Sequence, residues 1–324
     1  MAFWFEKNDF RRFRRIDMSV KLFVTPTAPI VDMDIHALGI DYFPNSVNKK
    51  IRQNHQRLLH WVNHIQEQKE ILQPVFLQVI DSAEMLGEAV KQVSLGKNPL
   101  LDEAFAKKIM SSLKMIGRIK SLEEPAPKTF QYFSEVEKKL THFYRLLLLS
   151  LHKSTPKTYH YFEPVTQTFK IDEMTKKFSQ PAFQKIPLVQ SINYMHKLVD
   201  DFCTVFQEMN QDYYLREHPE AWRVHDVTIS AGGFSALFPK RYLPGKQLTT
   251  YMYFQNHGRA MNVHTTFARC QTKPDKMSEL NAFYFEFPEP QDQQFLELEI
   301  ERLQIEKTVE HCMTSQWLAN FGGR

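Results

Sequence analysis

Apolar residues recur at a strict interval of seven in the first third of the chain. The positions are Ile51, Leu58, Ile65, Leu72, Val79, Leu86 and Val93. A stripe with this period is typical of a coiled-coil-like helix whose apolar side is buried against neighbouring helices. The pattern predicts one helix over residues 47–94, about 70 Å long at 1.5 Å per residue. Pro74 lies inside the run, and we expect it to kink or split the helix.

Three later segments also have helical spacing of apolar residues, at 100–120, 128–153 and 188–214. Loops that contain Gly or Pro separate the first three helices, at 96–99 and 123–127. Residues 154–187 have a poorer pattern, and we expect a mixed connector there. Either the later helices fold back along the heptad helix, or copies of the chain pair along it to form a homo-oligomer.

Strand patterns lie on both sides of this helical region. Residues 20–24 and 28–35 form two expected strands around a turn at Thr25–Thr27. Downstream strands are expected in 222–234 and at 247–254, 262–268 and 282–287, followed by a helix over 290–304. The fold class is therefore α+β, with an antiparallel β-barrel and a bundle or coiled coil of long helices.

The N-terminal strands are flanked by residues suited to a nucleotide. Arg11 and Arg15 stand four residues apart in a basic run. Arginine binds phosphate bidentately, stacks on bases and can grip the O6/N7 edge of guanine. A solvated basic terminus is the alternative interpretation. A short hairpin would bring the segment from Asp34 to Gly39 back beside the arginines.

This layout resembles the PilZ family of cyclic di-GMP receptors, whose signature is Arg-x-x-x-Arg, a strand or two, then Asp/Asn-x-Ser-x-x-Gly. Arg11, Arg15, Asp34 and Gly39 match that signature. His36 stands where the family has serine, and an imidazole can donate or accept a hydrogen bond. The resemblance implies that these five residues bind cyclic di-GMP as a ligand, without a metal.

A second stretch, from Trp222 to Phe234, resembles the central part of a PilZ barrel. Ser230 and Gly233 fit the serine and glycine of the motif, and are weaker candidates for the ligand site. Thr228 replaces the acidic residue, and Asp226 lies two places early. The sequence leaves open whether the N-terminal strands complete this barrel or form a second, truncated copy.

Four regions follow from these patterns. Residues 1–45 form an arm or truncated barrel, 46–215 a helical region, 216–306 a PilZ-like barrel, and 307–324 a C-terminal tail. At 324 residues with 43% hydrophobic content, the chain is long enough for more than one core. The net charge of +4 is mild, so we expect no specific nucleic-acid partner.

Other chemistry is weakly represented. Three widely spaced cysteines indicate free thiols of a reducing compartment rather than a disulfide framework or a zinc set. His60 and His64 share a helix face, but a third metal ligand is not evident. No secretory leader, membrane span, nucleophile motif or phosphate-binding loop is recognised. We therefore expect a cytoplasmic protein that is not an enzyme.

The preferred hypothesis is a cyclic di-GMP-responsive signalling effector or adaptor that acts through an unidentified protein partner. The alternative is a degenerate PilZ scaffold that does not bind nucleotide. Such a scaffold would oligomerise through the heptad helix at 51–93 and assemble a motility, pilus or secretion complex. His36 and Thr228 favour the alternative because both depart from the motif.

Overall fold

Alternating apolar and polar residues build a closed antiparallel barrel. In β4 (Gly233–Phe238), for example, Phe234, Ala236 and Phe238 are buried while the residues between them are half-buried. The computed structural model describes residues 14–164, 168–178, 180–273 and 278–321, with the backbone alone at 114–118 and 311–321. The strand order around the barrel is β1-β3-β4-β8-β7-β6, and β6 closes onto β1. The remaining strands are β1 (Ile16–Pro26), β3 (Val224–Ser230), β6 (Gln247–Phe254), β7 (Arg259–Lys273) and β8 (Ser278–Glu286).

Strand β1 belongs to this barrel and not to a second one. It pairs with β3 through Ile16 and Ile229, and with β6 through Pro26 and Leu248. The described residues therefore form one barrel, and the helices are inserted between its first strand and β3. Of the two alternatives that the sequence left open, β1 completes the downstream barrel, because it finds both of its partners more than 200 residues downstream.

The sequence predicts a second strand at 28–35, but this segment after β1 is irregular. Its backbone bonds to the helical region: Ile35 donates to the Gly96 carbonyl and His36 to the Thr155 carbonyl. Only the two-residue strand β2 (Ile40–Asp41) follows, paired with β5 (Arg241–Tyr242). The predicted hairpin does not form, because the ends of helices satisfy the backbone groups that a second strand would have paired.

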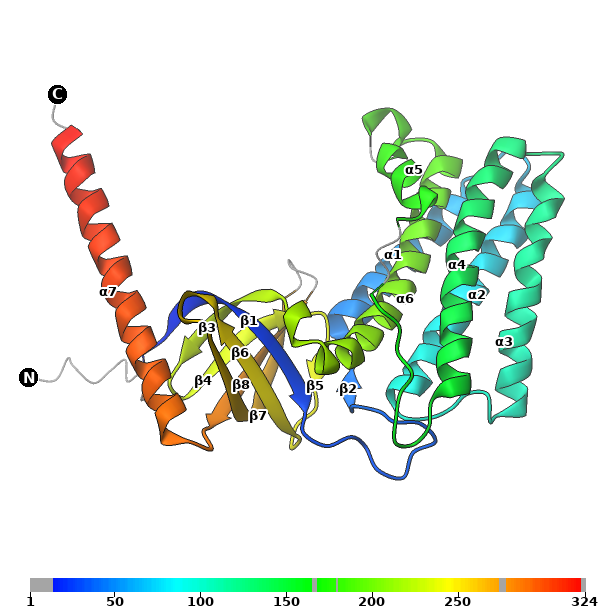
Figure 1. The fold of residues 1–324 in the computed structure, drawn as a ribbon. Helices are drawn as coiled ribbons and strands as arrows, with labels where there is room; N and C mark the ends of the chain where they lie inside the picture. The colour runs from blue at the N-terminus through cyan, green and yellow to red at the C-terminus, as the bar shows by residue number, and fades with distance from the viewer. Residues whose placement is uncertain (1–13, 165–167, 179, 274–277, 322–324) are drawn as a thin grey trace, which may run out of the picture.

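The inserted region is a bundle of helices beside the barrel (Figure 1). Its α-helices are α1 (Asn45–Asn63), α2 (Lys69–Ser94), α3 (Glu103–Met115), α4 (Pro127–Lys153), α5 (Lys170–Phe178) and α6 (Pro187–Glu217). Short 3-10 helices lie at Ile116–Leu122, Pro181–Phe183 and Pro219–Ala221 in this region, and at Gln255–His257 in the barrel. Helix α6 packs against both α1 and α2. The expected mixed connector at 154–187 contains α5, which its short apolar pattern did not reveal.

The heptad stripe is buried inside this bundle. Leu58, Leu72, Leu86 and Val93 are each at most 1% exposed. The stripe spans two helices, and the break falls at residues 64–68, where Gln68 adopts a left-handed conformation. Pro74 lies within α2 instead of ending it. The run is therefore split into two helices, at residues 64–68 and not at Pro74, and its apolar seam is buried within the bundle.

A buried charged cluster joins the bundle to the barrel. Lys240, between β4 and β5, forms an ion pair with Asp212 of α6, and Tyr42 donates to the same carboxylate at 2.7 Å. Burial alone would lower the pKa of Lys240, but Asp212 outweighs it and raises that pKa. All three side chains are nearly inaccessible to solvent. The cluster ties α6 to the barrel at one defined position.

Helix α7 (Pro290–Phe321) follows the barrel and runs past it into solvent (Figure 1). It continues well beyond residue 304, where the sequence pattern ended it, so residues 307–321 extend this helix. Leu296 and Ile300 are its buried apolar anchors. Among the described residues, no helix is both long enough and apolar enough to span a membrane.

Candidate ligand-binding site at the barrel rim

Arg15 stands at the rim of the barrel, directly before β1. Its neighbour Ile16 pairs with Ile229 in an antiparallel register, so Arg15 lies beside Ser230, one step further along. The Arg15 side chain is exposed. Within the described part of the chain, its guanidinium has no ion-pair or hydrogen-bond partner. Arg11 lies outside the described residues.

The turn from β3 to β4 faces Arg15 across this rim. Ser230 Oγ donates to the Gly233 carbonyl at 3.2 Å. A Cβ atom at position 233 would lie 2.1 Å from the Phe283 carbonyl oxygen, so only glycine fits there. The glycine lets β4 and β8 approach closely, which fixes the shape of the turn. Of the two weaker sequence candidates, Ser230 lies beside Arg15, and Gly233 pairs with Ser230 on the next strand.

Polar side chains continue from this turn along the outer face of β1 and β3. Thr228 Oγ1 donates to Asp17 Oδ1 at 2.6 Å, and Ser19 Oγ donates to Asp226 Oδ1 at 2.6 Å. Asp17 and Asp226 are exposed. Thr228 therefore lies against a carboxylate, which Asp17 of the neighbouring strand supplies. Sequence reasoning missed Asp17 because its partner strand lies 211 residues away.

Tyr284 adds an exposed aromatic ring to the same region. It pairs with Gly233 across β4 and β8, and 63% of it is exposed. The neighbouring Phe283 is buried, so the alternation of β8 places Tyr284 on the outside of the barrel. An exposed tyrosine opposite a glycine is a surface on which a planar base can stack. The alternation of apolar and polar residues in the sequence indicates that Tyr284 is exposed. Only the pairing of the strands shows that it lies on the same part of the barrel surface as Arg15.

The other predicted residues lie elsewhere. Asp34 accepts a hydrogen bond from the Asn98 amide at 3.0 Å, at the end of the bundle. His36 is buried against Tyr213, with ring centroids 5.6 Å apart, and burial followed by Arg216 lowers its pKa. Gly39 has a φ of 73° and packs on Ile30. Arg15 and this segment lie at opposite ends of β1, whose 11 residues span about 35 Å, so the structure does not bring them together.

Chemically, the rim combines three kinds of group. Arg15 offers a fixed positive charge and a planar fork of donors. Asp17 and Asp226 offer carboxylate acceptors, and Tyr284 offers a ring face. Guanine carries donors at N1 and N2 and acceptors at O6 and N7, so these groups complement a guanine nucleotide with its phosphate.

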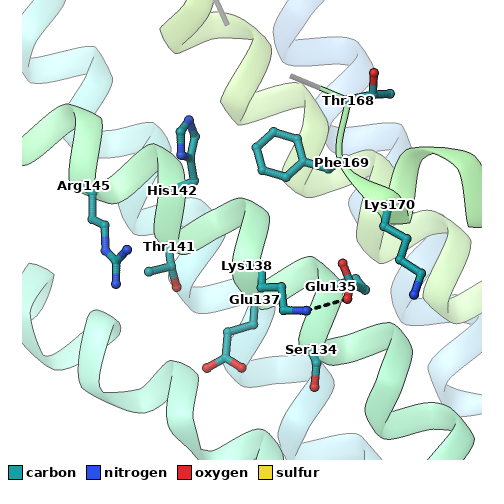
Figure 2. Close-up of a pocket in the computed structure, with 10 residues that line it drawn as sticks. All are labelled: Ser134, Glu135, Glu137, Lys138, Thr141, His142, Arg145, Thr168, Phe169 and Lys170. Carbon is teal, nitrogen blue, oxygen red and sulfur yellow. Dashed lines mark hydrogen bonds and ion pairs between the residues drawn. The ribbon is translucent and has the colours of Figure 1, made fainter. Parts of the chain in front are cut away.

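A hollow of about 710 Å³ lies on α4 in the bundle (Figure 2). Lys138 in its wall forms an ion pair with Glu135 at 2.6 Å. Burial raises the pKa of the Glu137 carboxyl to about 6. Arg145 and Lys170 are drawn at opposite ends of the view. The wall therefore mixes both signs of charge and does not select one class of ligand.

Three potential metal ligands gather near α4, namely Asp172, His196 and Asp200. Lys139 Nζ lies 2.7 Å from a carboxylate oxygen of both aspartates. Burial would lower the pKa of Lys139, but Asp200 and Asp172 outweigh it and raise that pKa. The ammonium group occupies the position that a cation would take, so the trio is explained as a buried ion-pair network.

Comparison of the chain with protein-family models, with curated proteins and with solved structures finds no match. The barrel rim is therefore interpreted from its own residues, register and charges.

Proposed function

We propose that this protein is a receptor for cyclic di-GMP that binds the nucleotide at the barrel rim and passes the signal to a protein partner. One observation carries the proposal. Pairing of β1 with β3 brings Arg15 beside Ser230, which lies more than 200 residues away in sequence and pairs with Gly233 of β4. An arginine near a serine and a glycine supports the resemblance to PilZ receptors, although the N-terminal candidates Asp34, His36 and Gly39 have no part in this arrangement.

In this proposal each rim group has a distinct task. Arg15, together with Arg11, binds a phosphate and the Hoogsteen edge of guanine. The turn at Ser230–Gly233 lets the ligand approach the backbone closely. Asp17 accepts from the guanine N1 and N2 donors, and Tyr284 stacks on a base. None of these tasks breaks a covalent bond, so the function proposed is binding.

The test is calorimetric titration of the full chain with cyclic di-GMP, with Arg15→Ala and Arg14→Ala compared as a matched pair. Both variants lose one exposed arginine of the same run. Charge-assisted hydrogen bonds contribute about 1.5–3 kcal/mol, so Arg15→Ala should weaken binding at least tenfold, or about 1.4 kcal/mol. Arg14→Ala should change it by less than about threefold.

A second readout locates the site within the rim. Tyr284→Ala should weaken binding by about tenfold through lost stacking, while Asp34→Ala should leave it unchanged. If wild-type protein gives neither heat nor a thermal shift with cyclic di-GMP, the receptor proposal is wrong. Equal losses in the Arg14 and Arg15 variants would show that only general positive charge is involved.

A scaffold that does not bind nucleotide is the second candidate, and one contact favours it. Thr228 occupies the acidic position of the motif, and its hydroxyl is already bonded to Asp17. A scaffold would keep this contact and lack a nucleotide response. Its oligomerisation could not use the heptad face, because that face is buried within the chain.

A further inference from the structure

Helix α7 presents an apolar face that points away from the barrel. Leu298 is 59% exposed, Ile305 65% and Val309 50%. Successive spacings of seven and four residues place the three side chains on one side of an α-helix. The anchors Leu296 and Ile300 lie on the opposite side, against the barrel. Every side chain from 305 to 310 is exposed, and Leu298, Ile305 and Val309 are among the large apolar side chains that the fold leaves exposed.

The same stretch of α7 is acidic. Residues 290–310 contain six acidic and two basic residues. Glu301 is exposed next to the apolar face, and Glu306 forms an ion pair with Arg302. An apolar stripe flanked by carboxylates is complementary to a segment that is both aromatic and basic.

One segment of this chain has that composition. Residues 1–15 contain five basic and two acidic residues, with aromatic side chains at Phe3, Trp4, Phe5, Phe10 and Phe13. Residues 1–13 lie outside the described part of the chain. They join the structure at Arg14, close to α7: Lys307 Nζ donates to the Asp17 carbonyl at 2.6 Å.

Residues 1–13 are long enough to reach the outer face of α7. Thirteen residues span up to about 45 Å when extended, whereas half the circumference of a helix about 10–12 Å across is about 17 Å. A second copy of α7 fits less well, because it would bring like charges together along both edges of the seam. An anionic membrane surface is disfavoured for the same reason.

We propose that residues 1–13 dock on the outer face of α7, over Leu298, Ile305 and Val309. Aromatic side chains of the segment cover the apolar stripe, and its arginines pair with Glu301 and Glu306. The arrangement shields the exposed apolar face of the helix, and it links the N-terminal segment to α7. It does not depend on nucleotide binding.

Hydrogen exchange of the amides in 298–310, measured on the full-length protein, tests the proposal. Phe10→Ser with Phe13→Ser should speed exchange there by about tenfold, because the helix loses its cover. Arg12→Glu with Arg14→Glu should have a similar effect. The surface pair Lys97→Glu with Lys157→Glu alters the same number of charges elsewhere and should leave α7 unchanged.

Charge reversal on both sides distinguishes docking from a loss of helix stability. The double variant Glu301→Lys, Glu306→Lys should exchange faster than the wild type at 298–310. When Arg12→Glu and Arg14→Glu are added to this variant, protection should be restored. A structural defect in α7 would not be rescued in this way. Exchange that is unaffected by every change in residues 1–13 overturns the proposal. Protection that rises with protein concentration also overturns it, because it indicates a second copy on this face.

Discussion

Helices α6 and α7 are nearly equal in length, 31 and 32 residues, but they differ in how many of their residues are buried. Helix α6 buries 18 of its residues, several of them polar. Over the described side chains of α7, at 290–310, three are buried. The difference shows that the fold of this chain is organised around α6, which contacts α1, α2, α4, α5 and β1. Among the described side chains of α7, the buried ones lie at 296–300, in the first third of the helix.

The largest expected effect comes from the buried charges of α6. Asp212→Ala leaves Lys240 without its carboxylate in a site closed to water. Breaking a buried ion pair on one side costs about 3–5 kcal/mol, measured as the free energy of unfolding in urea. Glu306→Ala in α7 removes an exposed ion pair and should cost about 0.5 kcal/mol or less. Similar losses in the two variants would refute the contrast.

A matched pair of leucines sharpens the comparison. Leu198 in α6 is 1% exposed and Leu298 in α7 is 59% exposed. Leu198→Ala should destabilise the protein by about 2–5 kcal/mol, because it leaves a cavity in the bundle. Leu298→Ala should cost less, about 1 kcal/mol, because only the docked residues 1–13 cover it. A loss at Leu298 as large as the loss at Leu198 would refute the contrast between the two helices.

Acidic pH should act on α6 more than on α7. His196 of α6 bonds to Asp172 and Thr175, and Asp200, which pairs with Lys139, lies within 4.8 Å of it. Burial, and then Lys139, lowers its pKa below the usual histidine value of about 6.5. The unfolded chain therefore takes up a proton near pH 6.5 that the folded chain resists. This contribution to stability is present above pH 6.5 and is lost as the pH falls towards the lowered pKa.

The measurement is the melting temperature from pH 8 to pH 5 for wild type and for His196→Gln. The variant should lose part of the acid sensitivity of the wild type, by an amount smaller than the effects of Asp212→Ala and Leu198→Ala. His218→Gln, at a partly exposed position at the end of α6, is the control and should follow the wild-type curve. Parallel curves for wild type and His196→Gln would show that this imidazole is not the group concerned.

The sequence predicted helices well where the apolar pattern was long and regular. The segments 128–153 and 188–214 coincide closely with α4 and α6, because one continuous stripe of each is buried. The break at residues 64–68 was missed, since the heptad continues through Ile65, which is buried although it lies in the loop. Periodicity reports which side chains face the core, and it does so whether or not the backbone remains helical.

The residues that surround Arg15 in the candidate site were predicted less well than the helices, and for a different reason. Arg15 and Ser230 were both recognised as candidates, but the sequence assigned Arg15 to the nearer motif at Asp34–Gly39. Proximity along the chain favoured that choice, whereas pairing of β1 with β3 decided otherwise. Tyr284 and Asp17 were not recognised because their importance depends on strand register. Long-range register is set by closure of the whole barrel, and no local pattern encodes it.

The insertion of the helices between β1 and β3 also affects synthesis. Ile16 leaves the ribosome 213 residues before its partner Ile229. At about 5–20 residues per second, this delay is about 10–40 seconds. During that time β1 is an unpaired apolar strand, although the bundle can already form beside it. Folding of the barrel is therefore the late, slow step, and the nascent chain is most exposed to aggregation and to chaperones before β3 and β6 arrive.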